Sequence, residues 1–180
     1  MANKTKKYLV TTSHQKVLSF LLNHPSRSYE EKKIVKATKI SKTAVNEALR
    51  GLAKDGLILR EKKGRMSLHS VDLDNPVIQR LKSTENVSLL MPLIGQLKKN
   101  SQKVILFGSC AEGTNIEASD IDLFILTNYP DDAERIVQSS FLAGKIQPFI
   151  KTPSEFINID KKNPVFYQEI SRGIVLWEKK

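Results

Sequence analysis

Residues 104–127 read VILFGSCAEGTNIEASDIDLFILT, and this stretch decides the fold of the second half of the chain. The continuously apolar run Val104–Phe107 is typical of a buried strand, and it ends at Gly108. A short polar segment follows, and a second apolar run opens with Asp120 and Asp122. Two strands joined through a glycine turn and a polar segment predict an α/β unit whose polar groups gather at the strand ends.

The polar groups of this stretch suit a phosphate and a metal ion. Gly108 permits a sharp turn with the backbone close to a ligand, and Ser109 adds a hydroxyl and an amide at a helix or turn N-terminus. Asp120 and Asp122 stand two residues apart on a strand, so both side chains leave the same face. Mg²⁺ accepts such a carboxylate pair together with waters and substrate phosphates. The pattern therefore predicts phosphoryl or nucleotidyl transfer, although each half alone is common.

The stretch resembles the signature of the DNA polymerase β-type nucleotidyltransferase superfamily, in its minimal branch. The likeness is carried by Phe107-Gly108-Ser109, Gly113 and Ser119-Asp120-Ile121-Asp122-Leu123, and it extends over about residues 86–180. It implies a small α/β fold with a short mixed sheet, and transfer of a nucleoside monophosphate from an NTP to a hydroxyl of a protein or small molecule. By the same resemblance, Gly108 and Ser109 bind the nucleotide, and Asp120 and Asp122 are the catalytic ligands of Mg²⁺.

One departure from the family concerns a third carboxylate, which the family carries on the next strand as metal ligand and base. In the expected strand Lys145–Ile150, Gln147 or Pro148 stands at that place, and a glutamine cannot take a proton. Glu155 and Glu112 are the acids left to substitute for it. The departure favours an alternative function, that of a non-catalytic transcription regulator whose degenerate domain senses nucleotide or dimerises. A second alternative is an antitoxin-like minimal nucleotidyltransferase that pairs with a toxin protein.

All of the excess positive charge lies in the first two-fifths of the chain. Residues 1–72 contain 16 Lys and Arg against 6 Asp and Glu, whereas residues 73–180 contain 13 of each. The first segment therefore carries the whole net charge of +10. A segregated basic half favours a polyanion partner such as double-stranded DNA. The alternative is a lysine-rich surface that only faces water.

The basic half has the pattern of three helices followed by a hairpin, spread over residues 12–72. Capping boxes at Thr12 and Ser28 and a cap at Ser41 predict the three helix starts, and Gly64 lies in the expected hairpin turn. This order resembles that of winged helix-turn-helix transcription regulators. A three-helix unit that only packs or dimerises is the alternative.

In a winged helix the third helix enters the major groove and the hairpin lies on phosphates. The expected third helix has a polar face opposite its apolar stripe, and the hairpin tip is basic. The predicted DNA-binding residues are Lys42, Thr43, Asn46, Arg50, Arg60, Lys62, Lys63 and Arg65. Because such regulators usually bind as dimers to two-fold sites, a homodimer is expected as well.

Length and composition set the remaining expectations. The 180 residues suffice for two domains, and we expect an α+β protein with a winged helix at 1–72, a linker at 73–85 and a nucleotidyltransferase-like domain at 86–180. No apolar run approaches the ~18 residues that span a membrane, and the N-terminus lacks the apolar core of a signal peptide. A single cysteine excludes an intrachain disulfide, which together with these features predicts a cytoplasmic protein.

Overall fold

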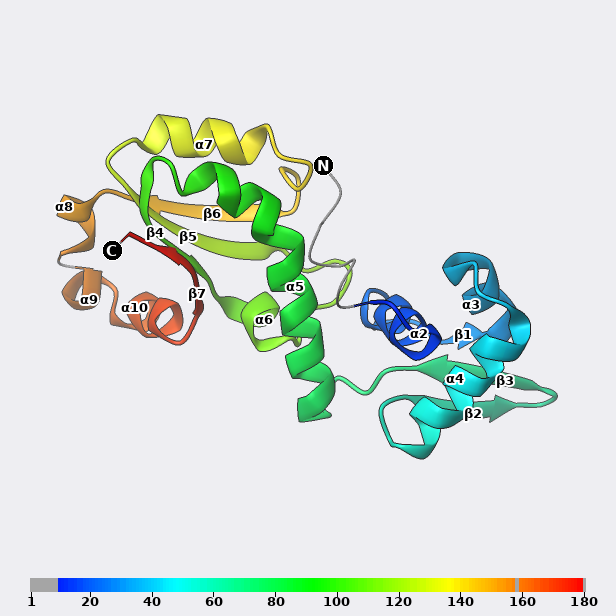
Figure 1. The fold of residues 1–180 in the computed structure, drawn as a ribbon. Helices are drawn as coiled ribbons and strands as arrows, with labels where there is room; N and C mark the ends of the chain where they lie inside the picture. The colour runs from blue at the N-terminus through cyan, green and yellow to red at the C-terminus, as the bar shows by residue number, and fades with distance from the viewer. Residues whose placement is uncertain (1–9, 158, 180) are drawn as a thin grey trace. The chain divides into compact units, whose positions relative to one another are not determined.

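The computed structural model describes residues 10–157 and 159–179. The chain divides into two compact units, with the boundary between Glu85 and Asn86. Helices and strands occur in both units, so the predicted α+β class is confirmed (Figure 1). Within the described residues, no helix is both long and apolar enough to cross a lipid bilayer.

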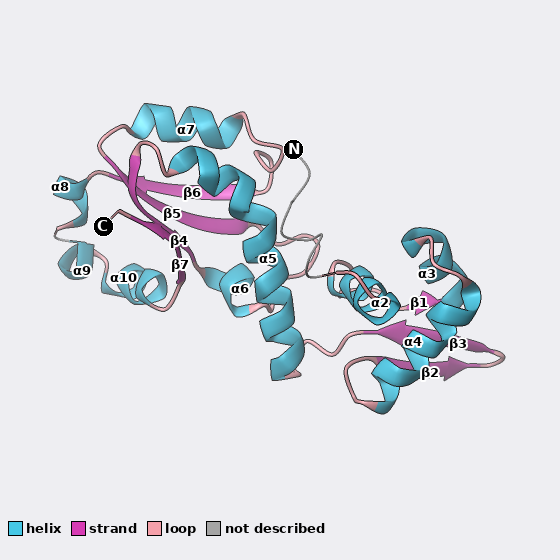
Figure 2. Cartoon of the chain, in the orientation of Figure 1, coloured by secondary structure: helices cyan, strands magenta, loops and turns pink. Residues whose placement is uncertain are grey.

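The N-terminal unit combines three helices with a small antiparallel sheet, as Figure 2 shows. The sheet has the strand order β1-β3-β2. The elements are α2 (Ser13–Leu22), β1 (Tyr29–Glu30), α3 (Glu31–Thr38), α4 (Lys42–Lys54), β2 (Leu59–Lys63) and β3 (Met66–Ser70). The sequence predicts three helices followed by a hairpin. The structure has this order and adds the short strand β1.

Local side-chain caps explain two of the three helix starts. Thr12 and Gln15 form the predicted capping box at the start of α2, and the Ser41 hydroxyl accepts the N–H of Ala44 at the start of α4. The capping box predicted at Ser28 is wrong, because α3 begins after Glu30 without any side-chain cap. Residues 29 and 30 pair with β3 instead, and this extended backbone delays the start of the helix.

The apolar stripes of the three helices meet in one core. Burial of α4 at every third or fourth residue leaves its other face in water, as the amphipathic pattern predicts. The buried apolar residues of this unit are Val17, Leu18, Leu21, Leu22, Ile34, Val45, Ala48, Leu49, Leu52, Ile58, Val71 and Ile78.

The C-terminal unit is built on a mixed four-stranded sheet, which agrees with the predicted fold class. Its strand order is β6-β5-β4-β7, with β5 and β6 parallel and the other pairs antiparallel. The strands are β4 (Ser101–Leu106), β5 (Ile121–Thr127), β6 (Ile146–Lys151) and β7 (Ile174–Glu178). Helix α5 (Pro76–Leu97) crosses the boundary between the two units, and the other helices are α6 (Gly108–Glu112), α7 (Pro130–Gln138), α8 (Pro153–Phe156), α9 (Ile159–Lys162) and α10 (Pro164–Ser171).

Helices cover both faces of this sheet (Figure 1). On one face, apolar side chains of α7 and of the second half of α5 pack against Val104, Leu106, Leu123 and Ile125. On the other face, a smaller and largely aromatic cluster joins the sheet to α8 and α10. Its members are Ile105, Phe107, Phe124, Leu126, Phe149, Phe156, Phe166 and Ile170.

Helix α5 joins two helices that the sequence predicts between residues 73 and 100, namely a linker helix after a break at Pro76 and a second amphipathic helix over 87–99. Asn75 caps its start by accepting the N–H of Val77, and the helix continues to Leu97 across Pro92. No glycine or proline stands between residues 77 and 91 to end it. The expected linker helix is therefore continuous with the helix that follows it.

Candidate active site

A left-handed glycine joins the end of β4 to helix α6. Gly108 has a φ of 64°, and a Cβ placed on it would lie 2.5 Å from Oδ2 of Asp122. Any residue other than glycine would be strained there and would also collide with the carboxylate. The glycine turn and the second aspartate, 14 residues apart in sequence, are therefore in direct contact in space.

The backbone of β5 holds the aspartates near this turn. The N–H of Phe107 donates to the carbonyl oxygen of Asp122 at 3.1 Å, one residue beyond the end of β4. Asp122 is half-buried, whereas Asp120 is exposed just before the start of β5. Cys110, buried in α6, donates its thiol to the carbonyl oxygen of Asp120 at 3.4 Å.

Ser109, the other half of the predicted nucleotide-binding pair, is half-buried in the first turn of α6. Its carbonyl oxygen accepts the N–H groups of Gly113 and Thr114, at 2.9 and 3.0 Å. Gly113 is left-handed, with a φ of 81°, and ends the helix after a single turn.

The negative charge around Asp122 raises the pKa of its carboxyl group. Burial is the largest cause, followed by the charges of Asp120 and of Glu169 on α10. Carboxylates that repel one another at a half-buried position gain from a bound cation. The turn at Gly108 and the Asp122 carboxylate against it form what we call the glycine corner. Its electrostatics favour a cation beside Asp122.

A cavity of about 650 Å³ opens at this corner. Gly108 and Asp122 stand on its sheet side, and Glu169 and Arg172, one turn apart on α10, also line it. The remaining lining residues are Phe107, Glu112, Phe149, Asn163, Val165 and Phe166. Its volume lies in the range of about 300–1,000 Å³ that is usual for small-molecule sites.

Sequence reasoning missed Glu169 and Arg172. Their spacing of three residues on a helix that begins at Pro164 indicates one polar helix face. That signal places both side chains on the same face of α10, but it does not say which strand the face approaches.

The strand beside β5 has no acid where the family carries one. Gln147 lies directly opposite Asp122 in the parallel register of β5 and β6, so both side chains leave the same face of the sheet. Glu155 does not replace the acid, because its carboxylate accepts the N–H and hydroxyl of Thr152 in the capping box of α8. The Thr152 backbone hydrogen bond is the largest of the causes that lower the Glu155 pKa. Glu112, the other substitute considered, does line the cavity.

The donors at this corner suit Mg²⁺ only when a substrate is bound as well. Among the described residues, no three His, Cys, Asp or Glu side chains are grouped closely enough to hold a metal ion by themselves. Mg²⁺ is usually held by one or two carboxylates, and waters and substrate phosphates complete its shell. Asp120 and Asp122 provide these two carboxylates.

In the N-terminal unit, every predicted DNA-binding residue is exposed. Lys42, Thr43, Asn46 and Arg50 lie on α4, Arg60, Lys62 and Lys63 on β2, and Arg65 in the hairpin turn. Two of these side chains have partners within the protein. The Asn46 amide donates to Glu31 at 2.8 Å, and the Arg60 guanidinium donates to Ser67.

A groove of about 430 Å³ lies between α4 and the hairpin. Five of the predicted residues line it, namely Lys42, Asn46, Arg50, Arg60 and Arg65. His69 lies at the same groove and is buried, and its pKa is lowered, first by burial and then by the charge of Arg60. The imidazole is therefore neutral at pH 7 and adds no charge to the groove.

The mixed sheet, with its glycine turn against a carboxylate, defines a small α/β domain of the nucleotidyltransferase type. Residues 93–180 match the family model for polymerase beta nucleotidyltransferases. The resemblance seen in the sequence is thus confirmed. The match contains all four of the residues predicted to bind nucleotide and metal.

The chain also resembles two solved structures at low identity. One is a candidate nucleotidyltransferase from Sulfolobus solfataricus, at 16% identity over 56% of this chain and 87% of that chain, with a TM-score of 0.39. The other is TrmBL2, an archaeal chromatin protein, at 12% identity over 91% of this chain and 70% of that chain, with a TM-score of 0.31. No curated protein matches the sequence.

Proposed function

We propose that the C-terminal unit transfers a nucleoside monophosphate from an NTP to an acceptor hydroxyl in a Mg²⁺-dependent reaction. The observation that carries this proposal is the contact between Gly108 and Asp122, in which only the missing Cβ leaves room for the carboxylate. The match of residues 93–180 to the polymerase beta nucleotidyltransferase family model supports the same class of reaction. The acceptor is a protein side chain or a small molecule.

Each residue of the corner has a role in this proposal. Backbone groups at Gly108 and Ser109 contact the triphosphate, and Asp120 and Asp122 hold Mg²⁺. The bound ion neutralises phosphate charge and assists in-line displacement. Arg172 adds a fixed positive charge for the phosphates. Glu169 supplies negative charge from α10, since Gln147 on the neighbouring strand is neutral.

We further propose that the N-terminal unit binds double-stranded DNA as a winged helix, as one half of a homodimer. Helix α4 would enter the major groove with Thr43, Asn46 and Arg50, and the hairpin would place Lys62 and Lys63 on phosphates. The exposure of all eight predicted residues supports this arrangement. To reach a base, Asn46 must exchange its hydrogen bond to Glu31 for one to the DNA.

The transfer reaction is tested by incubating the protein with each α-labelled NTP and Mg²⁺, with and without cell extract. We expect a labelled product with the native protein and none with Asp120→Ala plus Asp122→Ala. Asp131→Ala plus Asp132→Ala, which removes two carboxylates from the first turn of α7, is the matched control and keeps the activity. Equal labelling by the native protein and the Asp120/Asp122 variant would contradict the proposal.

The neutral Gln147 favours a second function, that of a regulator that binds an NTP without turning it over. In that case the native protein retains the labelled NTP, forms no product and binds DNA with an altered affinity. The same incubation, followed by a DNA-binding titration, separates this function from the transfer reaction.

A further inference from the structure

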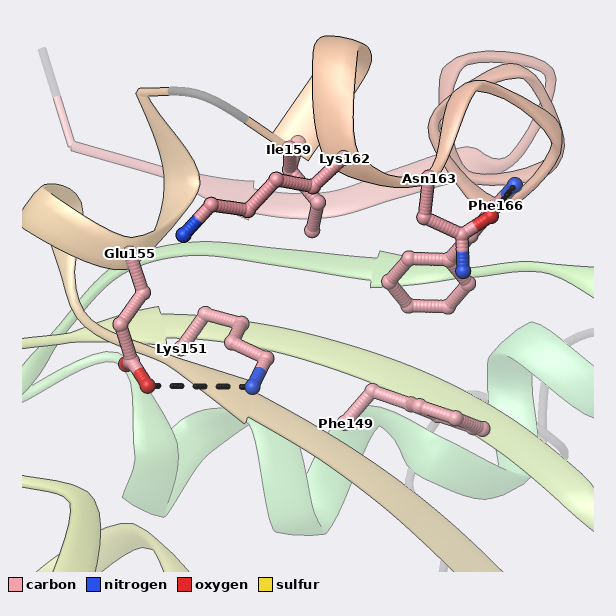
Figure 3. Close-up of a pocket in the computed structure, with 7 residues that line it drawn as sticks. All are labelled: Phe149, Lys151, Glu155, Ile159, Lys162, Asn163 and Phe166. Carbon is pink, nitrogen blue, oxygen red and sulfur yellow. Dashed lines mark hydrogen bonds and ion pairs between the residues drawn. The ribbon is translucent and has the colours of Figure 1, made fainter.

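A second cavity adjoins the one at the glycine corner, on the same face of the sheet. It measures about 360 Å³ and shares three of its walls, Phe149, Asn163 and Phe166, with the first cavity. Figure 3 shows that Lys151 and Glu155 lie on one side of it, while Lys162 reaches over it from α9. A ligand bound at the glycine corner can therefore extend into this second space.

Aromatic rings form much of the apolar wall of the second cavity. The rings of Phe149 and Phe166 pack with their centroids 5.2 Å apart, and both also contact Phe107 beside the glycine corner. Both rings are half-buried, so part of their surface faces the cavity. An aromatic wall of this kind suits a planar ring, because ring stacking buries apolar surface on both partners.

Two side chains of the second cavity offer hydrogen-bond donors. The Glu155 carboxylate accepts from Thr152 through Oε2, and its Oε1 lies 3.8 Å from Nζ of Lys151 in an exposed ion pair. Asn163 accepts the N–H of Phe166 with Oδ1, and Figure 3 shows its amide nitrogen on the opposite side, toward Phe149. Lys162 forms no hydrogen bond or ion pair with any described residue. An ammonium group and an amide N–H₂ are thus free to donate.

The combined length of the two cavities matches that of a nucleotide. Gln147 stands level with Asp122, and Lys151 lies four residues further along β6, a distance of about 13 Å at ~3.3 Å per residue. A nucleoside triphosphate whose phosphates lie at Gly108 reaches the second cavity along the shared wall of Phe149. A further phosphate group is a poorer occupant, because the wall is aromatic and the Glu155 carboxylate adds a negative charge beside Lys151.

We propose that the second cavity receives the nucleobase of the NTP and selects bases with a keto edge, guanine or uracil. This inference rests on the function proposed for the glycine corner. At the exocyclic position guanine offers the acceptor O6 and uracil the acceptor O4, which Lys162 or Asn163 can satisfy, whereas adenine and cytosine present an amino donor at that position. A donor that faces a donor leaves both groups unpaired.

The test is equilibrium binding of ATP, GTP, CTP and UTP to the full-length protein in the presence of Mg²⁺. We expect GTP or UTP to bind about tenfold more tightly than ATP and CTP, as one or two well-placed hydrogen bonds allow. Lys162→Ala should weaken the binding of GTP and UTP and leave the affinity for ATP unchanged. Lys161→Ala, which removes the same charge outside the cavity lining, is the control.

A second variant changes the donor itself. Asn163→Asp keeps an oxygen to cap α10, since Asp and Asn cap equally well, but replaces the amide donor with an acceptor. We expect this variant to reduce the preference for keto bases, so that ATP or CTP binds more tightly relative to GTP.

Equal binding of all four nucleotides, unchanged by these variants, would overturn the nucleobase site and leave the proposed transfer reaction standing. Inorganic triphosphate that binds as tightly as GTP would overturn it as well, because the base would then contribute nothing. If no NTP binds at all, the transfer reaction itself fails, and the two failures are thereby distinguished.

Discussion

At the scale of single residues, the candidate site depends on Gly108. A left-handed backbone brings the end of β4 against the Asp122 carboxylate, and the space for a side chain is filled by that carboxylate. Because Oδ2 is the far end of a side chain that can rotate, a Cβ at this position would push the carboxylate aside rather than disrupt the sheet.

We therefore predict that Gly108→Ala weakens NTP binding much more than it weakens the fold. The left-handed backbone costs about 1 kcal/mol of stability, and the displaced carboxylate no longer holds Mg²⁺ at the corner. Urea unfolding and NTP titration measure the two effects. Gly56→Ala is the matched control, because Gly56 has a φ of 70° with nothing within 4 Å. The prediction fails if both variants bind NTP equally well.

Asp122 gives a pH-dependent prediction. Its pKa in the folded protein is raised above the ordinary value of an aspartate carboxyl, mainly by burial, so the folded state favours the protonated carboxyl. Stability is then highest below the unfolded pKa and falls as pH rises through the folded pKa. Asp122→Asn removes this cost, and at pH 7 without Mg²⁺ we expect its Tm to be higher by about 1–2 °C.

Thermal unfolding between pH 3 and 8 checks this expectation for Asp122, with Asp131→Asn on α7 as the surface control. The advantage of Asp122→Asn should vanish at the acid end, where the native carboxyl is protonated as well. A lower Tm for the variant at pH 7 would show that the ionised carboxylate stabilises the fold, contrary to the argument.

At the scale of elements, α10 decides what faces the glycine corner. This one helix contributes Phe166, Glu169 and Arg172 to the first cavity, and its cap Asn163 lines both cavities. Gly173 at the end of α10 has no space for a side chain, since a Cβ there would lie 2.5 Å from Ile105 Cγ2 and 2.6 Å from the carbonyl oxygen of Leu106.

We predict that Gly173→Ala moves α10 away from β4 and destabilises the C-terminal unit by about 2 kcal/mol, as expected for overpacking against backbone. NTP binding should weaken with it, because the cavity wall shifts. Denaturant unfolding and NTP titration measure both effects. Gly144→Ala, with nothing within 4 Å, is the control in the same unit. Native-like stability of Gly173→Ala would show that the turn adapts without moving the helix.

At the scale of the whole molecule, charge and chemistry are divided between two units. Residues 1–72 carry the net charge of +10, and the proposed transfer site lies wholly in the other unit. Each unit has its own buried core. A basic unit of this kind should bind duplex DNA with an affinity that depends steeply on salt.

We predict that Lys62→Ala plus Lys63→Ala reduces the slope of log affinity against log salt by about 2, since each phosphate contact contributes roughly 0.9. Fluorescence anisotropy on mixed-sequence duplex DNA between 50 and 200 mM salt measures the slope. Lys98→Ala plus Lys99→Ala removes the same charge from the end of α5 and should leave the slope unchanged. Equal slopes for the two double variants would contradict a role of the hairpin in DNA binding.

The sequence by itself determined the features that depend on neighbours along the chain. The apolar runs on either side of the Gly-Ser and Asp-x-Asp motifs predicted β4 and β5. Gln147 or Pro148 was predicted to replace the family's third acid, and the register places Gln147 beside Asp122. Periodicity, caps and turn residues act within a few positions, so these features can be predicted from short stretches.

Only the tertiary structure decided which side chains meet. The pairing of residues 29 and 30 with β3 replaced the predicted cap at Ser28, and the two helices expected between residues 73 and 100 form the single helix α5. Glu169 and Arg172 reach the corner because α10 packs on the aromatic face of the sheet. Strand register and helix packing join residues that are far apart in sequence. The free energy of such contacts depends on both partners, so a short stretch of sequence does not predict them.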